Sequence, residues 1–411
     1  MKKTLAALLL LTASVFAQSP AEIAVAAARK AIEKKPAQSS GYNMLAVALA
    51  RRARETSDVN FYTQAEDALK KSAELAPGNF EAERLHVWLL LGRHEFAAAL
   101  DTAKSLNQKM PDDVLVYGFI TDANVELGNY GEAEKSAQWM LNLRPGNLPA
   151  LTRGAYLREL FGDIDGAYEL MQMALQGTPP TENEDRAWIL NQLAHLDLVS
   201  GKIDDAESIL KQALMSFPGY HYALGNLAKV RIEQRRYAEA VDLLQQRYQA
   251  APHAENLYDL AAALELAGRT SEAQTMFTEF EQKSLAETTK ADNSNHELVF
   301  YYADYANQPA KALEVAQREY ARRHDVFTLD AYAWALHKNG QDVEGRKQIE
   351  AALAVSVRDA KLFRHAGEIA LKLGDQEAAK GYLQTAANFN APGSREASDL
   401  LVWLAAQKMQ R

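Results

Sequence analysis

The sequence predicts an all-α solenoid built from antiparallel helix pairs that recur about every 34 residues. Seven prolines reveal this period, because they are separated by 41, 34, 34, 34, 39 and 34 residues. An alanine stands twelve residues before each of these prolines, so two residue types keep one register. The prolines are Pro36, Pro77, Pro111, Pro145, Pro179, Pro218 and Pro252, and the alanines are Ala24, Ala65, Ala99, Ala133, Ala167, Ala206 and Ala240.

Each period contains two amphipathic helices. In the unit that ends at Pro218, the spacing i, i+3, i+4, i+7 is apolar at its first three positions, from Leu190 to Ala194, and again from Ala206 to Phe217. Gly201 lies between these runs, and glycine tolerates the left-handed conformation in which many helices end. Equivalent glycines are Gly92, Gly128, Gly162, Gly268, Gly340 and Gly374. Such frequent stops exclude a long coiled coil.

This pattern resembles the tetratricopeptide repeat family. The family's unit has 34 residues, a small residue in the first helix, a second small residue early in the second helix and a closing proline. These features occur here in sets such as Ala155, Ala167 and Pro179, or Ala228, Ala240 and Pro252. The resemblance covers nearly all of the chain after its first residues and implies a right-handed superhelix of about ten repeats.

The register assigns every element in order. A leading helix is expected at residues 19–35 and a closing helix at residues 394–410, on either side of ten repeats. The repeats are predicted to begin near Ser39, Phe80, Val114, Leu148, Ala187, His221, Glu255, Asn295, Val326 and Ala360. We expect each repeat to contact only its neighbours, so that the solenoid forms an open trough.

Three departures from the period interrupt this register. Extra residues around 51–60 and 181–185 are expected to form loops on one edge of the solenoid. The polar segment 283–295 is a candidate hinge that would divide residues 18–282 from residues 296–411. An ordinary longer turn explains this segment equally well.

The first residues have the pattern of a secretory signal peptide. Lys2 and Lys3 precede an apolar run at residues 5–16, and Ser14 and Ala17 are the small residues that a signal peptidase prefers. We expect cleavage after Ala17, which leaves a solenoid at residues 18–411 that is exported, periplasmic or secreted, most simply in a bacterium. No later stretch is apolar enough to predict a transmembrane span. Zero cysteines exclude disulfides and thiolate nucleophiles.

Motifs for chemistry are scarce. The sequence contains no Gly-rich phosphate loop, no nucleophile elbow and no zinc helix. Glu83 and His86 have the spacing of a di-iron ligand pair, but no second such pair occurs. A formal charge of −9, from 45 Lys and Arg against 54 Asp and Glu, disfavours nucleic acid as a partner. We predict no catalytic residue, cofactor or metal.

The resemblance implies that first helices line the concave surface, so exposed first-helix positions are candidates for contact with a ligand. Aromatic residues and arginine often carry binding energy at interfaces. The candidate groove residues are Arg84, Trp88, Asp122, Arg153, Tyr156, Trp188, Asn191, His195, Tyr222, Asn226, Lys229, Asp330, Trp334, Arg364 and Glu368. The competing interpretation is that Trp88, Trp188 or Trp334 fills space between repeats.

Three functions are compatible with these features. The leading hypothesis is a non-catalytic scaffold that binds a peptide or partner protein in its groove and assists assembly of a cell-envelope or exported complex. A second is a self-assembling homo-oligomer. The third, an all-helical glycan hydrolase with paired carboxylates, is disfavoured because closed helical barrels do not require a strict period.

Overall fold

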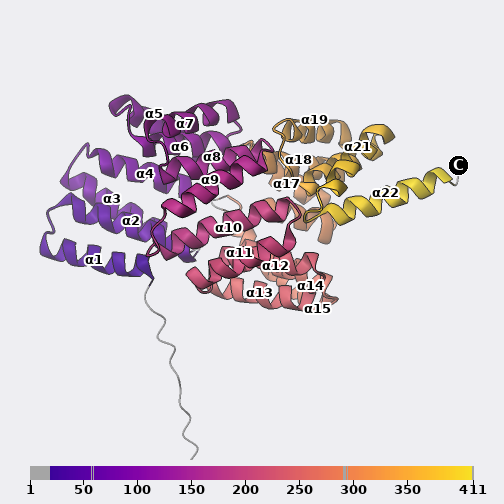
Figure 1. The fold of residues 1–411 in the computed structure, drawn as a ribbon, viewed down its shortest axis with the longest axis horizontal. Coiled ribbons are helices and arrows are strands. Elements are labelled where there is room, and N and C mark those ends of the chain that lie inside the picture. Colours follow the sequence, from indigo (N-terminus) through magenta and orange to yellow (C-terminus); the bar gives the residue numbers. More distant parts are fainter. Residues whose placement is uncertain (1–18, 57, 59, 290–292, 294, 410–411) are drawn as a thin grey trace, which may run out of the picture.

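The structure is a computed structural model that describes residues 19–409, except residues 57, 59, 290–292 and 294. In this part of the chain it contains 22 α-helices, one five-residue π-helical turn and no strand (Figure 1). The leading helix is α1 (Pro20–Lys34) and the closing helix is α22 (Ser394–Met409). The predicted signal peptide, residues 1–17, lies outside the described residues. No described helix combines the length and apolar character needed to cross a bilayer.

Ten helix pairs lie between α1 and α22. The first helices are α2 (Ser39–Thr56), α4 (Phe80–Gly92), α6 (Val114–Glu126), α8 (Leu148–Leu160), α10 (Asn183–Val199), α12 (His221–Glu233), α14 (Ala254–Leu266), α16 (Asn295–Phe300) with η1 (Tyr301–Tyr305), α18 (Val326–Lys338) and α20 (Ala360–Lys372). The second helices are α3 (Asn60–Leu75), α5 (Phe96–Lys109), α7 (Tyr130–Leu143), α9 (Ile164–Gly177), α11 (Ile203–Ser216), α13 (Tyr237–Ala250), α15 (Thr270–Leu285), α17 (Pro309–Tyr320), α19 (Asp342–Leu353) and α21 (Gln376–Asn388). The predicted repeat starts are confirmed to within one residue, except at α10.

Side-chain caps fix where several first helices begin. Asn79, Asp113 and Asn147 each accept a hydrogen bond from a backbone N–H in the first turn of the helix that follows. A capping oxygen satisfies a donor that the helix itself cannot pair. The short turn after each closing proline therefore starts the next helix at a defined residue.

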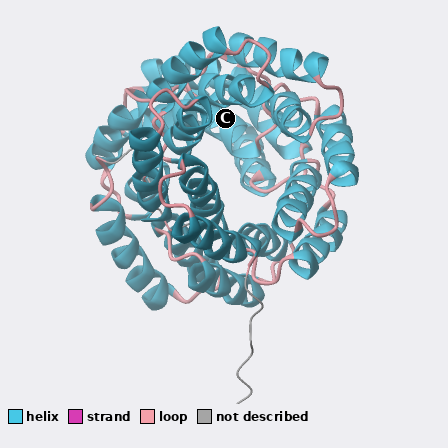
Figure 2. Ribbon diagram, turned by 90° about the vertical axis from the view of Figure 1, so that its left-hand side faces the viewer, coloured by secondary structure: helices cyan, strands magenta, loops and turns pink. Residues whose placement is uncertain are grey.

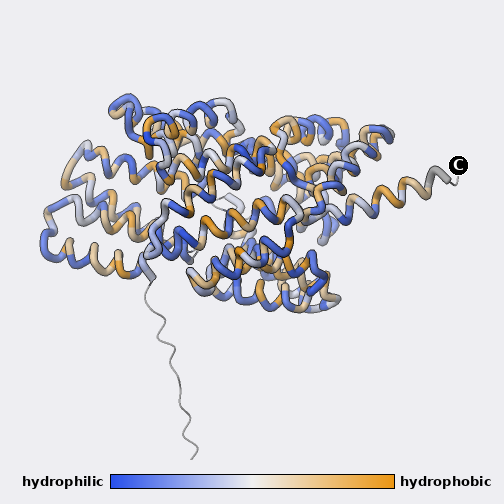
Figure 3. Tube along the Cα trace, in the orientation of Figure 1, coloured by the Kyte–Doolittle hydropathy of each residue, from blue (hydrophilic) through white to orange (hydrophobic). Residues whose placement is uncertain are grey.

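Alanines allow the two helices of a pair to approach closely. Ala194 in α10 and Ala206 in α11 are both 0% exposed and belong to one apolar cluster. A methyl group at a helix crossing leaves room for larger neighbours in the adjoining grooves. Ala65, Ala99, Ala133, Ala167 and Ala240 are likewise fully buried. Figure 3 shows the result, since apolar residues recur along each helix rather than in one long segment.

The loops expected around residues 51–60 and 181–185 are largely helical instead. Residues 51–56 continue α2 and residues 183–185 begin α10, so that α2 has 18 residues and α10 has 17, compared with 13 in α4, α6 and α8. Residues 57 and 59 lie outside the described residues. Neither added segment contains glycine or proline, which are the residues that would stop a helix. Gly92 differs from the expectation that a left-handed glycine stops the first helix. It is the last residue of α4, and the left-handed residue after this helix is His94, with a φ of 58°.

The expectation of an open trough with nearest-neighbour contacts is also wrong. The helices coil around a central axis (Figure 2), and the second turn of the superhelix packs on the first. Arg323 contacts the Glu126 carboxylate at 3.2 Å, and the backbone N–H of Val326 donates to the Tyr130 hydroxyl at 2.9 Å. One apolar cluster joins Leu157 and Leu160 to residues of α18 and α20. The fold is an all-α solenoid whose successive turns touch.

The core continues past the candidate hinge at residues 283–295. Phe277 and Phe280 in α15 lie with their ring centroids 5.3 and 5.7 Å from that of Tyr301 in η1. One apolar cluster extends from Ala228 to Ala335 across this segment. The division of the solenoid into residues 18–282 and 296–411 stays a prediction.

Candidate ligand-binding pocket

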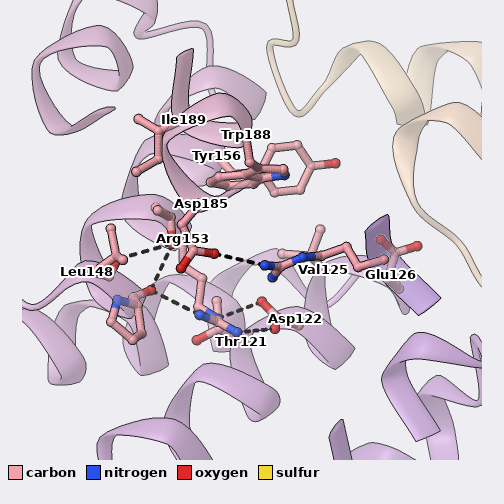
Figure 4. A pocket seen from close by; sticks show the side chains of 13 residues that line it. Thr121, Asp122, Val125, Glu126, Leu148, Arg153, Tyr156, Asp185, Trp188 and Ile189 are labelled. Atoms are coloured by element: carbon pink, nitrogen blue, oxygen red, sulfur yellow. Dashed lines mark hydrogen bonds and ion pairs between the residues drawn. The ribbon is translucent and has the colours of Figure 1, made fainter. Parts of the chain in front are cut away.

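The lengthened helix α2 meets α6, α8 and α10 around a pocket of about 410 Å³. A cavity of this size can hold one or two side chains or a small ligand. Figure 4 shows its lining. The lining residues are Arg54, Thr121, Asp122, Val125, Glu126, Leu148, Pro149, Thr152, Arg153, Tyr156, Asp185, Trp188 and Ile189.

Two aromatic rings form one wall of the pocket. Tyr156 comes from α8 and Trp188 from α10, and both lie across the pocket from Asp122 in Figure 4. Tyr156 is 37% exposed although protein surrounds it, and burial raises the pKa of its hydroxyl well above the ordinary value. The ring therefore offers an apolar face and a hydroxyl that stays protonated. Tyrosine and tryptophan with these properties are common anchor residues at interfaces.

Paired charges form the opposite side of the pocket. The Arg153 Nε donates to the Asp122 Oδ1 at 2.8 Å and to the Gly118 carbonyl at 3.0 Å. The Arg54 guanidinium bonds to Glu184 and, at 2.8 Å, to Asp185. Each arginine is held by a carboxylate from another helix. The pocket thus presents donors and acceptors in fixed positions, which can orient a ligand.

Glu126 is the most perturbed carboxyl group in the pocket. Burial raises its pKa to about 7, and the nearby Asp325 adds to this effect while Arg323 opposes it. Its carboxyl group can therefore gain or lose a proton near neutral pH. Asp325 and Arg323 belong to the second turn of the superhelix, so the contact between turns sets the protonation of this pocket residue.

Comparison with known proteins supports the repeat assignment. The family model for the tetratricopeptide repeat matches residues 197–264, which contain α11, α12 and α13 and most of α14. This segment of the chain therefore matches the tetratricopeptide repeat (TPR) family. The TPR repeat-containing protein MJ1428 of Methanocaldococcus jannaschii is 30% identical over 156 residues, which are 37% of this chain and 26% of that protein. This chain thus matches about a quarter of the length of that curated relative.

Solved structures with a similar fold include human IFIT1. The IFIT1 dimer with m7Gppp-AAAA has a TM-score of 0.51 and 13% identity over 92% of this chain and 96% of that chain. The IFIT1 dimer with PPP-AAAA has a TM-score of 0.50 and 14% identity over the same shares. At this level of identity the similarity concerns the fold of the TPR protein alone.

Four predicted groove residues of the TPR protein meet in the pocket, and several others do not line it. Asp122, Arg153, Tyr156 and Trp188 line it together. Arg84 pairs with Asp113 at 2.6 Å, and His195 lies 2.8 Å from Glu159. Trp88 is half-buried and packs against apolar clusters that join α2, α4 and α6.

Four of the predicted groove residues are buried and cannot be reached from the groove in this structure. Trp334 and Asp330 are each 2% exposed, because both contact the buried His365. The Asn226 Nδ2 donates to the Asn191 Oδ1 at 3.0 Å, a bond that joins α12 to α10. Trp334 therefore fills space between repeats, and the asparagines hold neighbouring first helices together.

The remaining predicted residues lie elsewhere along the interior. Tyr222 is 36% exposed and contacts His221, with the rings tilted and their centroids 3.9 Å apart. Lys229 and Arg364 line a second cavity between the turns, and Arg364 is paired with Glu368. The predicted groove residues thus lie in several separate parts of the interior and do not form one continuous site.

Sequence reasoning missed Arg54, Glu126 and Asp185. Arg54 and Asp185 lie in the two segments that exceed the repeat length, so the extra residues themselves could have pointed to them. Glu126 gave no such indication, because its environment depends on Arg323, almost 200 positions later in the chain.

The possible metal pair does not form a site. Glu83 binds Lys109 at 2.7 Å, and His86 binds Glu66 at 3.2 Å. Among the residues that the structure describes, no group of three or more His, Asp or Glu side chains is placed to hold a metal ion.

Proposed function

We propose that this TPR protein is a non-catalytic scaffold that holds an extended segment of a partner protein inside the superhelix. The observation that carries the proposal is the pocket in which Tyr156 and Trp188 face a set of fixed charges. An aromatic or long aliphatic side chain of the partner would fill the pocket and contact both rings. Backbone amides of the same segment would bond to Asp122, Arg153 and Asp185.

A protein segment suits this interior better than a nucleic acid. IFIT1 shares the fold, but the net charge of −9 and the pairing of Arg54 and Arg153 with carboxylates leave little positive charge in this pocket for phosphates. We also propose export, on the basis of the signal peptide that the sequence predicts at residues 1–17. We therefore propose that the scaffold assists the assembly of a cell-envelope or exported complex.

Crosslinking in the native envelope, followed by mass spectrometry, tests this proposal. A double variant, Trp188→Ala with Tyr156→Ala, should recover the principal partner about tenfold less efficiently, because both anchor rings are lost. Trp139→Ala is the matched control, since Trp139 is 46% exposed on α7 and is not part of the pocket. Equal recovery by the double variant and the wild type would refute the pocket as the anchor.

The exported location has a separate test. N-terminal sequencing of the protein from its native host should give Gln18 as the first residue. A protein that retains Met1 and co-fractionates with cytoplasmic markers would contradict export while leaving the binding proposal intact.

A second candidate, self-association, is favoured by one observation on the closing helix. Val402 and Trp403 in α22 are 70% and 52% exposed, whereas Leu400 and Leu401 pack on the last repeat. A second copy could cover this face by twofold pairing of α22. Light scattering should then give a dimer that Trp403→Glu converts to a monomer, and a wild-type monomer at high concentration would exclude this candidate.

A further inference from the structure

A second cavity, of about 360 Å³, lies between the two turns of the superhelix. Lys229 of α12 lines it from the first turn. Arg358, which precedes the N-cap of α20, and Lys361, in the first turn of α20, line it from the second turn of the superhelix. The cavity is separate from the pocket of Tyr156 and Trp188, and the two have no lining residue in common.

These three cations lack close counter-ions. Among the described residues, no carboxylate lies within 4.0 Å of the charged nitrogens of Lys229, Arg358 or Lys361, although such pairs are common elsewhere in the structure. The Arg358 Nε is buried and makes no hydrogen bond. The other cations of the cavity differ, because Arg364 is paired with Glu368 and His195 with Glu159.

Two of the cations form cation–π contacts with aromatic rings, which carry no net charge to neutralise them. The Lys361 Nζ lies 3.1 Å from the ring centroid of Phe300, and the Arg358 guanidinium lies 4.8 Å from that of Phe389. Burial lowers the pKa of both Lys229 and Lys361, and more distant carboxylates such as Asp259 and Asp330 only partly oppose this effect. The Lys361 side chain is partly exposed, whereas Lys229 is exposed to the interior of the superhelix.

The two carboxylates that line the cavity form no ion pair with these cations, although Asp359 favours the charged form of both lysines at longer range. Asp359 caps α20, where its Oδ1 accepts the backbone N–H of Leu362 at 2.9 Å. Glu396, on α22, forms no ion pair within the described part of the chain. Three cations that line one cavity without an ion pair create a positive potential there, which attracts an anion.

We propose that this cavity is an oxyanion-binding site, in which Lys229, Arg358 and Lys361 bind a carboxylate or phosphate group of a small multivalent ligand. The Arg358 guanidinium supplies planar donors for two oxygens, and the lysines supply point charges from both sides. The site goes beyond the scaffold function, because it needs no protein partner. The bound anion joins α12 to α20 and so tightens the contact between the two turns.

Calorimetric titration of the mature full-length chain at low ionic strength tests the proposal, with sodium phosphate and sodium citrate as the two probes. At least one probe should bind saturably, and the stronger of the two identifies the preferred oxygen group. Lys229→Gln and Lys361→Gln should each weaken binding about tenfold, because each removes a charged hydrogen-bond donor. Lys380→Gln, at an exposed position on α21, should leave the affinity unchanged.

A second measurement protects the test against misfolded variants. The better probe should raise the thermal midpoint of the wild type and of Lys380→Gln, and this rise should be absent in the double variant of Lys229 and Lys361. Circular dichroism should show that all variants keep the wild-type helix content. The proposal is overturned if neither probe binds the wild type, or if the double variant binds as tightly as Lys380→Gln. Peptide capture by the Trp188 pocket is independent of either result.

Discussion

Two groups of repeats share one local turn but differ in what surrounds it. Gly162, after α8, and Gly374, after α20, both have a φ of 80°. A Cβ atom on Gly162 would lie 2.7 Å from the Ser356 carbonyl oxygen of the second turn, whereas one on Gly374 would meet nothing within 4 Å. At Gly374 the glycine only ends a helix. At Gly162 it also makes room for the second turn of the superhelix to pack on the first.

The glycines that contact the second turn of the superhelix lie at similar sequence separations from their partners. Gly128, Gly162 and Gly201 lie against His324, Ser356 and Asn390, at separations of 196, 194 and 189 residues. Each separation corresponds to five and a half repeats, because each glycine follows the first helix of a repeat and its partner follows the second helix of the repeat five units later. Long-range contact thus arises from a small rotation at each repeat, accumulated until the chain meets itself.

The largest expected effect comes from Gly162→Ala. We expect a loss of about 3 kcal/mol in the free energy of unfolding, because the left-handed conformation is strained and the methyl group overlaps the Ser356 carbonyl. Gly374→Ala should lose only about 1 kcal/mol, from the conformational strain alone. Urea unfolding followed by circular dichroism measures both, and equal losses would refute the role of Gly162 in seating the second turn.

Ala206→Leu should have the next largest effect. Ala206 is 0% exposed at a helix crossing, so a larger side chain should cost about 2 kcal/mol through overpacking. Ala379→Leu, in the hairpin that contains Gly374, should cost about the same, because Ala379 is also 0% exposed. A large difference between the two thermal midpoints would mean that crossings inside a hairpin depend on the contact between turns.

Glu126 provides a pH-dependent test at the contact between turns. Its pKa of about 7 in the folded protein exceeds the ordinary value, so the protonated carboxyl favours folding. This contribution is complete below the pKa of the unfolded chain, near 4.5, and is lost as the pH rises through 7. Glu126→Gln should therefore gain about 1 kcal/mol relative to the wild type between pH 5 and pH 8.

The control for this pH test is Glu134→Gln on the exposed face of α7. Its stability should change with pH as that of the wild type does. If the free energies of unfolding of Glu126→Gln and Glu134→Gln depend on pH in the same way, the second turn of the superhelix does not perturb the Glu126 carboxyl group.

The smallest effect is expected for Arg395→Ala. The Arg395 guanidinium lies 3.9 Å from Glu233 across the two turns, but its side chain is 41% exposed. Solvent and salt weaken such a pair, so we expect a loss below about 0.5 kcal/mol. A loss of more than about 1 kcal/mol in the same urea assay would show that surface charges, as well as carbonyl contacts at glycines, hold the turns together.

The hairpins could be predicted from sequence because their determinants are local. Ala206, Gly201 and Pro218 act within one repeat, and each lies where the register places it. The meeting of Glu126 with Arg323 could not be predicted, because it depends on rotations summed over several repeats. The pocket was predicted in part: Tyr156 and Trp188 occupy exposed first-helix positions, whereas Arg54 and Asp185 meet only because two length exceptions became helical.

Trp334 shows the opposite error of sequence reasoning. Trp334 and Trp188 both lie in first helices, and both have the residue type expected at a binding surface. The difference is set by His365, which stacks on Trp334 with ring centroids 4.0 Å apart. Position within the repeat therefore predicts which side chains face the axis, but the neighbouring repeat decides whether they stay accessible.

Seating of Gly128, Gly162 and Gly201 on the following turn fixes the number of units between them and their partners. Deleting or duplicating a single hairpin anywhere between α9 and α17 would shift the phase of the coil, so that His324 would face a different part of α6–α7. Individual helices can differ in length without this effect, as α2 and α10 do, whereas a change in the number of repeats within this span would require the whole contact to be rebuilt.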